Sequence, residues 1–189
     1  MQQCDSDLKE WHRPFGFQRS IHPPFAKIVN AVARNSECPL VVFKSWGDVW
    51  LQKILVPLGS ISELGFLEPV LRAMALVPDH RITLLRLMPR ETLEKELNKS
   101  ERELAGLLFL NAESEQISIR VVAAESRIHA ILETARQFDL VIMSANNQRG
   151  FRRAFFGSLA EDIAQRVDCT MLLVRGGLRF QDRFKPLGD

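Results

Sequence analysis

The sequence predicts an α/β domain built on a doubly wound, five-stranded parallel sheet. From residue 51 onward, short apolar runs alternate with longer amphipathic segments. The short runs are rich in Val, Ile and Leu and lack the alternation of polar and apolar residues that marks a strand with one face in water. Strands buried on both faces are typical of a parallel sheet covered by helices on each side. We therefore place this domain at residues 51–176.

Five segments are predicted as strands, and each is bounded by turn or charged residues. They are Lys53–Leu58, Arg81–Met88, Ile117–Ala124, Asp139–Ser144 and Thr170–Arg175. In such a sheet, ligands bind beyond the carboxyl ends of the strands, where the strand order reverses. This rule points to the turns that follow Leu58, Met88, Ala124 and Ser144.

The segments between the strands have helical spacing. Residues 126–137 are predicted as a helix. Its apolar residues fall on a single face, which the next residue continues: Ile128, Ile131, Leu132, Ala135 and Phe138. Residues 91–110 carry a similar stripe, formed by Leu93, Leu97, Leu104, Leu107 and Leu108. A helix over residues 157–167 turns Leu159, Ile163 and Val167 inward.

The first crossover is expected to hold a helix that ends near Leu76. A proline deep inside a helix removes a hydrogen bond and clashes with the preceding turn. We therefore expect Pro69 to occupy the first turn of this helix.

Composition narrows the classes of function. The chain has 189 residues, of which 46% are hydrophobic, and a formal charge of +2, too small for a general nucleic-acid binder. Cys4, Cys38 and Cys169 are far apart and lack a histidine at ligand spacing, so neither a disulfide framework nor a metal site is expected. No apolar run approaches the ~20 residues of a membrane span. These features predict a soluble, cytoplasmic protein.

A weak internal repeat of the domain's last segment precedes the domain. When Cys38 is placed on Cys169, residues 25–44 align with residues 156–175, with identities at Phe25, Ala33 and Cys38 and a shared apolar pattern. Residues 25–50 are therefore interpreted as the helix and strand that end an earlier copy, plus a linker; an unrelated helix and strand is the alternative. Residues 1–24 are interpreted as a leader and residues 177–189 as a tail, neither with the periodicity of a folded element.

The segments "KILVPLGS" and "ILETARQFDLVIMSANNQRGFRRAFFGSLAEDIAQRVDCTMLLVR" resemble a universal stress protein domain. The resemblance implies a flavodoxin-like three-layer sandwich of the adenine nucleotide alpha hydrolase kind. ATP-binding members of that family carry Gly-x-x-Gly, nine residues, and then Gly-Ser or Gly-Thr. They also end the first strand with an Asp that contacts the nucleoside.

This sequence departs from the family motif both at the glycines that approach the phosphates and at the Asp that contacts the nucleoside. Aligning Gly157-Ser158 with the end of the motif places Ser144 and Asn147 at the two earlier glycines, and "VPLGS" offers Leu58 and Gly59 in place of the Asp. Side chains there hinder the close backbone approach that a phosphate needs. The residues that the resemblance assigns to an ATP or anion site are Pro57, Leu58, Gly59, Ser144, Asn147, Arg149, Gly150, Gly157 and Ser158.

Two interpretations of the segment between Ser144 and Ser158 stay open. Arg149, Arg152 and Arg153 lie beside the start of a helix whose free N–H groups attract anions, so a phosphate could bind there. Alternatively, Ser158 is an N-cap and the arginines form a solvated loop. Outside this segment, His129 is expected at a surface or boundary position, and Cys169 is expected to pack rather than to react.

The sequence therefore predicts a regulatory or scaffolding domain in the stress response, with weak or no ATP binding and no catalytic residues or metal. The alternative is a nucleotide-binding switch for ATP or AMP, for example as the cytosolic regulatory part of a transporter. Universal stress domains commonly pair through their last strands, as homodimers or tandem copies. We therefore expect the strand Leu40–Phe43 to lie against Met171–Val174 and cover that edge.

Overall fold

The computed structural model describes residues 40–45, 51–107, 116–144 and 157–175. They form one six-stranded sheet in the order β1-β6-β5-β2-β3-β4. All neighbouring strands from β6 to β4 run parallel, and β1 pairs antiparallel with β6. The predicted doubly wound α/β fold is confirmed, with one strand added at the edge.

The five predicted strands lie close to their expected bounds. They are β2 (Lys53–Leu58), β3 (Arg81–Pro89), β4 (Ile117–Ala124), β5 (Leu140–Ser144) and β6 (Thr170–Arg175). Every residue of β2 after Lys53 is buried, as is every residue of β5 before Ser144. Their apolar runs are continuous because helices cover both faces of these central strands.

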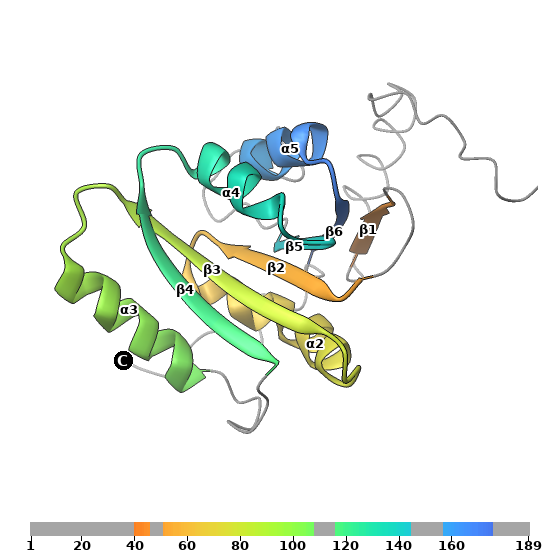
Figure 1. Cartoon of the computed structure of the whole chain (residues 1–189), viewed down its shortest axis with the longest axis horizontal. Helices are drawn as coiled ribbons and strands as arrows, with labels where there is room; N and C mark the ends of the chain where they lie inside the picture. The colour runs from red at the N-terminus through yellow and green to blue at the C-terminus, as the bar shows by residue number, and fades with distance from the viewer. Residues whose placement is uncertain (1–39, 46–50, 108–115, 145–156, 176–189) are drawn as a thin grey trace, which may run out of the picture.

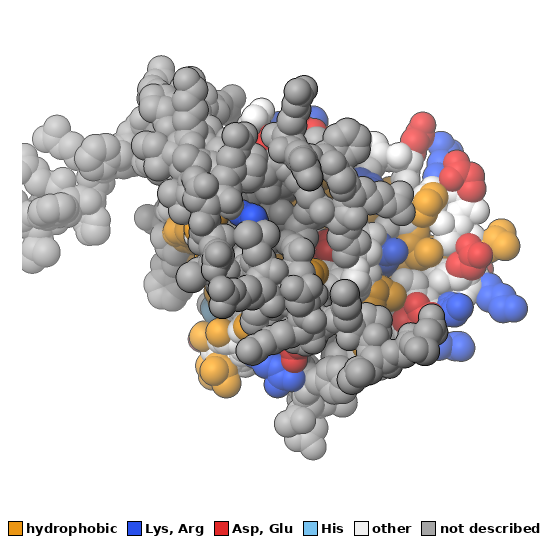
Figure 2. Space-filling view, turned by 180° about the vertical axis from the view of Figure 1, so that it is seen from behind, with side chains coloured by type: hydrophobic (Ala, Val, Ile, Leu, Met, Phe, Trp, Pro, Cys, Tyr) orange, Lys and Arg blue, Asp and Glu red, His pale blue; other side chains and the backbone are white. Residues whose placement is uncertain are grey.

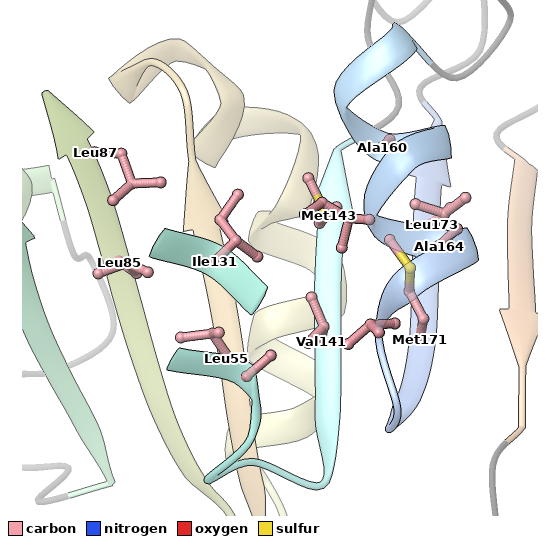
Figure 3. Close-up of a cluster of buried hydrophobic side chains, with 13 residues drawn as sticks. Leu55, Leu85, Leu87, Ile131, Val141, Met143, Ala160, Ala164, Met171 and Leu173 are labelled. Carbon is pink, nitrogen blue, oxygen red and sulfur yellow. The ribbon is translucent and has the colours of Figure 1, made fainter. Parts of the chain in front are cut away.

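The helices form two layers (Figure 1). Helices α2 (Leu64–Ala75) and α3 (Glu94–Leu107) cover one face of the sheet, and α4 (Arg127–Ala135) and α5 (Gly157–Arg166) cover the other. Figure 3 shows the second layer, where Ile131 of α4 and Ala160 and Ala164 of α5 face Val141 and Met143 of β5. Each face of the sheet thus has its own buried core.

Two helix predictions need correction. A short 3-10 segment, η2 (Ile61–Glu63), leads directly into α2, so Pro69 lies inside the helix rather than in its first turn. Leu64, Leu67 and Leu71 are all buried on one side of α2. Their burial holds the helix together across Pro69, whose ring is exposed to water.

The leucine stripe expected on residues 91–110 is only partly buried. Leu104 is fully buried, whereas Leu107 is 41% exposed and Leu93, which precedes α3, is 69% exposed. Leu97 is half-buried, and Leu108 lies outside the described residues. Because α3 covers β4 at the edge of the sheet, only a narrow stripe of the helix meets apolar partners.

Strand β1 (Leu40–Lys44) confirms the expected contact with the last strand of the domain. Val42 lies opposite Leu173, and Lys44 lies opposite Met171. The Lys44 Nζ also donates hydrogen bonds to the carbonyls of Ala164 at 2.7 Å and Val167 at 3.4 Å, at the end of α5. This amine therefore satisfies carbonyls that the helix itself leaves without partners.

The described surface mixes charges of both signs (Figure 2). Its ion pairs include Arg72 with Glu68 and Arg136 with Glu133, at 2.7 and 3.3 Å. Exposed pairs of this kind each contribute about 0 to 1 kcal/mol. Stability therefore comes mainly from the two cores.

Two valine truncations test this assignment. Val141 of β5 is fully buried, and Val122 of β4 is 42% exposed. We expect Val141→Ala to lower the free energy of unfolding by about 2 kcal/mol, because it removes buried methyl groups and leaves a cavity. The matched Val122→Ala should cost well under half of that. Urea unfolding measures both, and equal losses would contradict the assigned core.

Candidate functional site

The turns that follow β2 and β5 lie at the carboxyl edge of the sheet. Because β2 pairs with β3 on one side and β5 on the other, the strand order reverses between β2 and β5. This is the place where open α/β sheets bind ligands. The predicted site residues at the ends of β2 and β5 therefore lie at this edge of the sheet.

The structure brings only part of the predicted site together. Pro57 and Leu58 are buried at the end of β2, and Leu58 belongs to the core under α2, so its side chain does not replace the ligand-binding Asp of the family. Ser144 ends β5 and pairs with Val174 of β6. Asn147, Arg149, Gly150, Arg152 and Arg153 lie outside the described residues.

Gly157 and Ser158 both lie within helix α5 (Gly157–Arg166), so Ser158 is not its N-cap. Of the other candidates, His129 is exposed on α4, as expected. The Cys169 thiol packs against the core of the second layer, and burial raises its pKa to about 11. It is therefore protonated at neutral pH, which agrees with a packing role. Within the described ranges, no cluster of His, Cys, Asp and Glu could hold a metal ion.

Sequence reasoning missed a charged residue at the end of β2, Glu63. The Glu63 carboxylate of η2 accepts hydrogen bonds from the N–H groups of Gly59 at 3.3 Å and Ser60 at 3.1 Å. A glutamate three residues after a serine commonly reaches back to the backbone in this way, so the spacing of Ser60 and Glu63 was a usable signal. The carboxylate thus lies at the turn that follows β2.

A second missed residue, Arg86, reaches the same turn from β3. Its Nη1 donates hydrogen bonds to the carbonyls of Leu58, at 3.4 Å, and Gly59. Its Nε is buried and, in the described part of the chain, has no hydrogen-bond partner. Arg86 is the one charge inside the apolar run "ITLLRLM", which marked it as unusual without showing where it pointed.

Arg127 completes the cluster from the first position of α4. Its Nη1 would lie 3.8 Å from a Cβ atom added to Gly59. Burial and the nearby Arg127 cation lower the pKa of Arg86, and the Glu63 carboxylate opposes this shift. Two cations and one carboxylate therefore meet around Gly59.

The electrostatics of Glu63 are set mainly by burial. Loss of water raises the pKa of its carboxyl, and the hydrogen bonds from Gly59 and Ser60 and the charge of Arg86 offset only part of the shift. The hydrogen bonds and the Arg86 charge therefore stabilise the ionised carboxylate of Glu63, but by less than the loss of water destabilises it.

The backbone at the end of β2 is satisfied by the chain itself. The Glu63 carboxylate accepts hydrogen bonds from the N–H groups of Gly59 and Ser60, and Arg86 donates hydrogen bonds to the carbonyls of Leu58 and Gly59. We call these five residues, Leu58, Gly59, Ser60, Glu63 and Arg86, the β2 cap. Its backbone groups form a positioned network of hydrogen bonds, to which the Ser60 hydroxyl adds a contact with the Glu63 carboxylate at 3.4 Å.

A double-mutant cycle tests the contact between Gly59 and Glu63. A Cβ at position 59 would lie 2.8 Å from the Glu63 Oε1, so Gly59→Ala must displace the carboxylate. We expect Gly59→Ala to cost about 1 kcal/mol of unfolding free energy, the usual value of a hydrogen bond. In a Glu63→Ala background the same change should cost much less. Equal costs in both backgrounds would contradict the arrangement.

The raised pKa of Glu63 predicts a pH dependence. Its folded pKa lies above the ordinary value of 4.5, so the folded protein binds the proton more tightly than the unfolded chain. The contribution of Glu63 to stability must then fall as pH rises through the window that begins near 4.5. Against Glu63→Gln, the natural chain should lose relative stability as pH rises above the ordinary value of 4.5. A relative gain over this range, measured by urea unfolding, would mean that the pKa is lowered instead.

Comparisons with known proteins agree with this fold. A family model described as the universal stress protein family matches residues 51–175. A putative universal stress protein from Pseudomonas aeruginosa UCBPP-PA14 has 16% identity and a TM-score of 0.59, over 90% of this chain and 63% of that chain. A universal stress protein from Archaeoglobus fulgidus DSM 4304 has 15% identity and a TM-score of 0.54, over 82% of this chain and 57% of that one.

A functionally unknown protein from Pseudomonas aeruginosa PAO1 has 15% identity and a TM-score of 0.56, over 82% of this chain and 58% of that chain. At these identities the solved structures show a shared fold alone, and this chain spans 57 to 63% of their lengths. Comparison with curated proteins found no significant match.

The family match extends over most of the folded chain. It covers residues 51–175, which are 125 of the 189 residues, and contains β2 to β6 together with the four helices. The strand order and the cap at the reversal point lie inside the matched range. The chain therefore belongs to the universal stress protein family.

Proposed function

We propose that this chain acts as a regulatory or scaffolding domain in the stress response, without catalytic activity and with weak or no ATP binding. The observation that carries the proposal is the β2 cap. In the family pattern described above, an Asp at the end of the first strand contacts the nucleoside. Here the same end of the sheet is occupied by hydrogen bonds within the chain.

Opening the cap to a nucleoside would be costly. Displacing Glu63 leaves two N–H groups without their partner, and moving Arg86 frees the carbonyls of Leu58 and Gly59. Each buried polar group that loses its partner costs about 1 to 3 kcal/mol unless the ligand replaces the bond. A nucleoside would therefore have to replace several of these hydrogen bonds with its own.

The phosphate end supports the same conclusion. Ser144 stands at the position of the first motif glycine and is still paired with β6 through Val174. Its side chain occupies space that a glycine leaves free for the approach of a phosphate. The cap and Ser144 together predict weak binding at both ends of a nucleotide.

A nucleotide-binding switch is the second candidate, because the described residues around Gly59 carry an excess of positive charge. Among them, Arg86 and Arg127 are opposed by the carboxylate of Glu63. In this alternative the predicted arginine cluster replaces the contacts of the missing glycines. Arg149→Ala combined with Arg152→Ala would then weaken binding strongly, and an unchanged affinity would refute it.

Isothermal titration with ATP and Mg²⁺ tests the main proposal. We expect no saturable binding at concentrations up to about 1 mM, which corresponds to a binding free energy weaker than about 4 kcal/mol. A dissociation constant in the low micromolar range or tighter would contradict it.

A matched variant distinguishes the effect of the β2 cap from the effect of the two missing glycines at Ser144 and Asn147. Ser144→Gly with Asn147→Gly restores both glycines of the phosphate motif and leaves the β2 cap intact. We expect this variant to remain without tight binding, because the nucleoside end is unchanged. Micromolar binding by the glycine variant alone would show that the loop, and not the cap, is the obstacle.

A further inference from the structure

Strand β1 is attached to the domain by fewer contacts than β6 is. None of its five residues is buried, whereas β6 is buried along almost its whole length. Leu40 and Val42 pack against the core of the second layer, but Val41 and Phe43, on the other face of the strand, are each 50% exposed. β1 also lies outside residues 51–175, which the family model matches. The attachment of β1 therefore depends on one face of a short strand.

A charged side chain extends this attachment to a helix. Lys44 is the last residue of β1 and lies on the same face as Val42. Its Nζ donates hydrogen bonds to the carbonyls of Ala164 at 2.7 Å and Val167 at 3.4 Å. Lysines commonly bond the last carbonyls of a helix in this way. Lys44 thus joins β1 to the end of α5 as well as to β6.

The hydrogen bonds of Lys44 matter more than its charge. Burial lowers the pKa of the amine, and interactions with Cys169 and Asp168 offset only part of this shift. The charge is therefore held at a cost in hydration. A side chain without N–H donors would leave the carbonyls of Ala164 and Val167 without this partner, and unpaired carbonyls favour a local opening that water can enter. The donors of Lys44 are therefore what favours the attached position of β1.

Release of β1 would change which groups of the sheet are accessible. β1 lies along the outer edge of β6, and β5 pairs with the other edge (Figure 1). Val42 lies opposite Leu173, and Lys44 lies opposite Met171. Without β1, the backbone groups on the outer edge of β6 lose their hydrogen-bond partners. An open strand edge of this kind can pair with another chain.

We propose that β1 is a releasable strap over the outer edge of β6 and that Lys44 is its latch. In the attached state, the latch joins the end of β1 to the end of α5. In the released state, the two cores of the domain stay folded and the outer edge of β6 becomes accessible. The strap controls access to an edge of the sheet that takes no part in the β2 cap, so this inference goes beyond the proposed function and holds whether or not a nucleotide binds.

Amide hydrogen exchange of the full chain tests the strap and the latch. In the natural chain, we expect the β1 amides that pair with β6 to exchange at least about tenfold faster than those of β2 and β5, because β1 opens without the cores. Lys44→Met keeps an unbranched side chain and removes the donors. It should accelerate exchange in β1 by a further factor of about ten, while exchange in β2 and β5 stays unchanged.

Two further variants serve as controls. Lys44→Arg retains donors that can reach the same carbonyls, so its β1 amides should exchange within about threefold of the natural rate. Lys53→Met makes the same change at the exposed first residue of β2 and should leave β1 unaffected. Exchange of β1 as slow as that of β5 in the natural chain would overturn the strap. Unchanged β1 exchange in Lys44→Met, or equal acceleration of β1 and β5, would overturn the latch.

Discussion

The parallel pairing of β2 with both β3 and β5 is the constraint on which the rest of the molecule depends. A strand with parallel neighbours on each side needs helical connections that cross both faces, and this requirement produces the two cores. The Asp139 carboxylate helps to set the register, because it accepts hydrogen bonds from the N–H groups of Gln52 at 3.1 Å and Lys53 at 2.8 Å. The Asp139 N–H in turn donates to the Lys53 carbonyl at 2.9 Å. The amino ends of β2 and β5 are thereby held together.

The opposite ends of the same strands form the candidate site. Parallel strands deliver their carboxyl ends to one edge, so Glu63, Arg86 and Arg127, which are far apart in the sequence, meet around Gly59. Buried backbone groups are stable when their hydrogen bonds are made, and the β2 cap makes those of Leu58, Gly59 and Ser60 within the chain. Among the described residues, the buried Nε of Arg86 is the exception. The backbone groups at the end of β2 are thus already occupied by hydrogen bonds within the chain.

The sequence predicted the strands well because their burial is nearly complete on both faces. Continuous apolar runs such as "DLVIMS" have few other solutions, and the expected pairing through the last strand correctly placed Leu40–Phe43 against Met171–Val174. Prediction was weaker where tertiary packing decides the outcome: burial of Leu64 and Leu67 carries α2 across Pro69, and α3 at the sheet edge leaves Leu93 and Leu107 exposed. The cap was missed because Arg86 comes from another strand, and sequence spacing does not show which turn a side chain from β3 will reach.

The central claim is that the chain itself occupies the backbone at the end of β2. The most direct measurement is an amide NMR titration of the ¹⁵N-labelled protein with ATP and Mg²⁺, followed at Gly59 and Ser60. The account predicts that these two resonances stay in place at millimolar nucleotide, because their N–H groups remain bonded to Glu63. Saturable shifts of both resonances at micromolar nucleotide would contradict it.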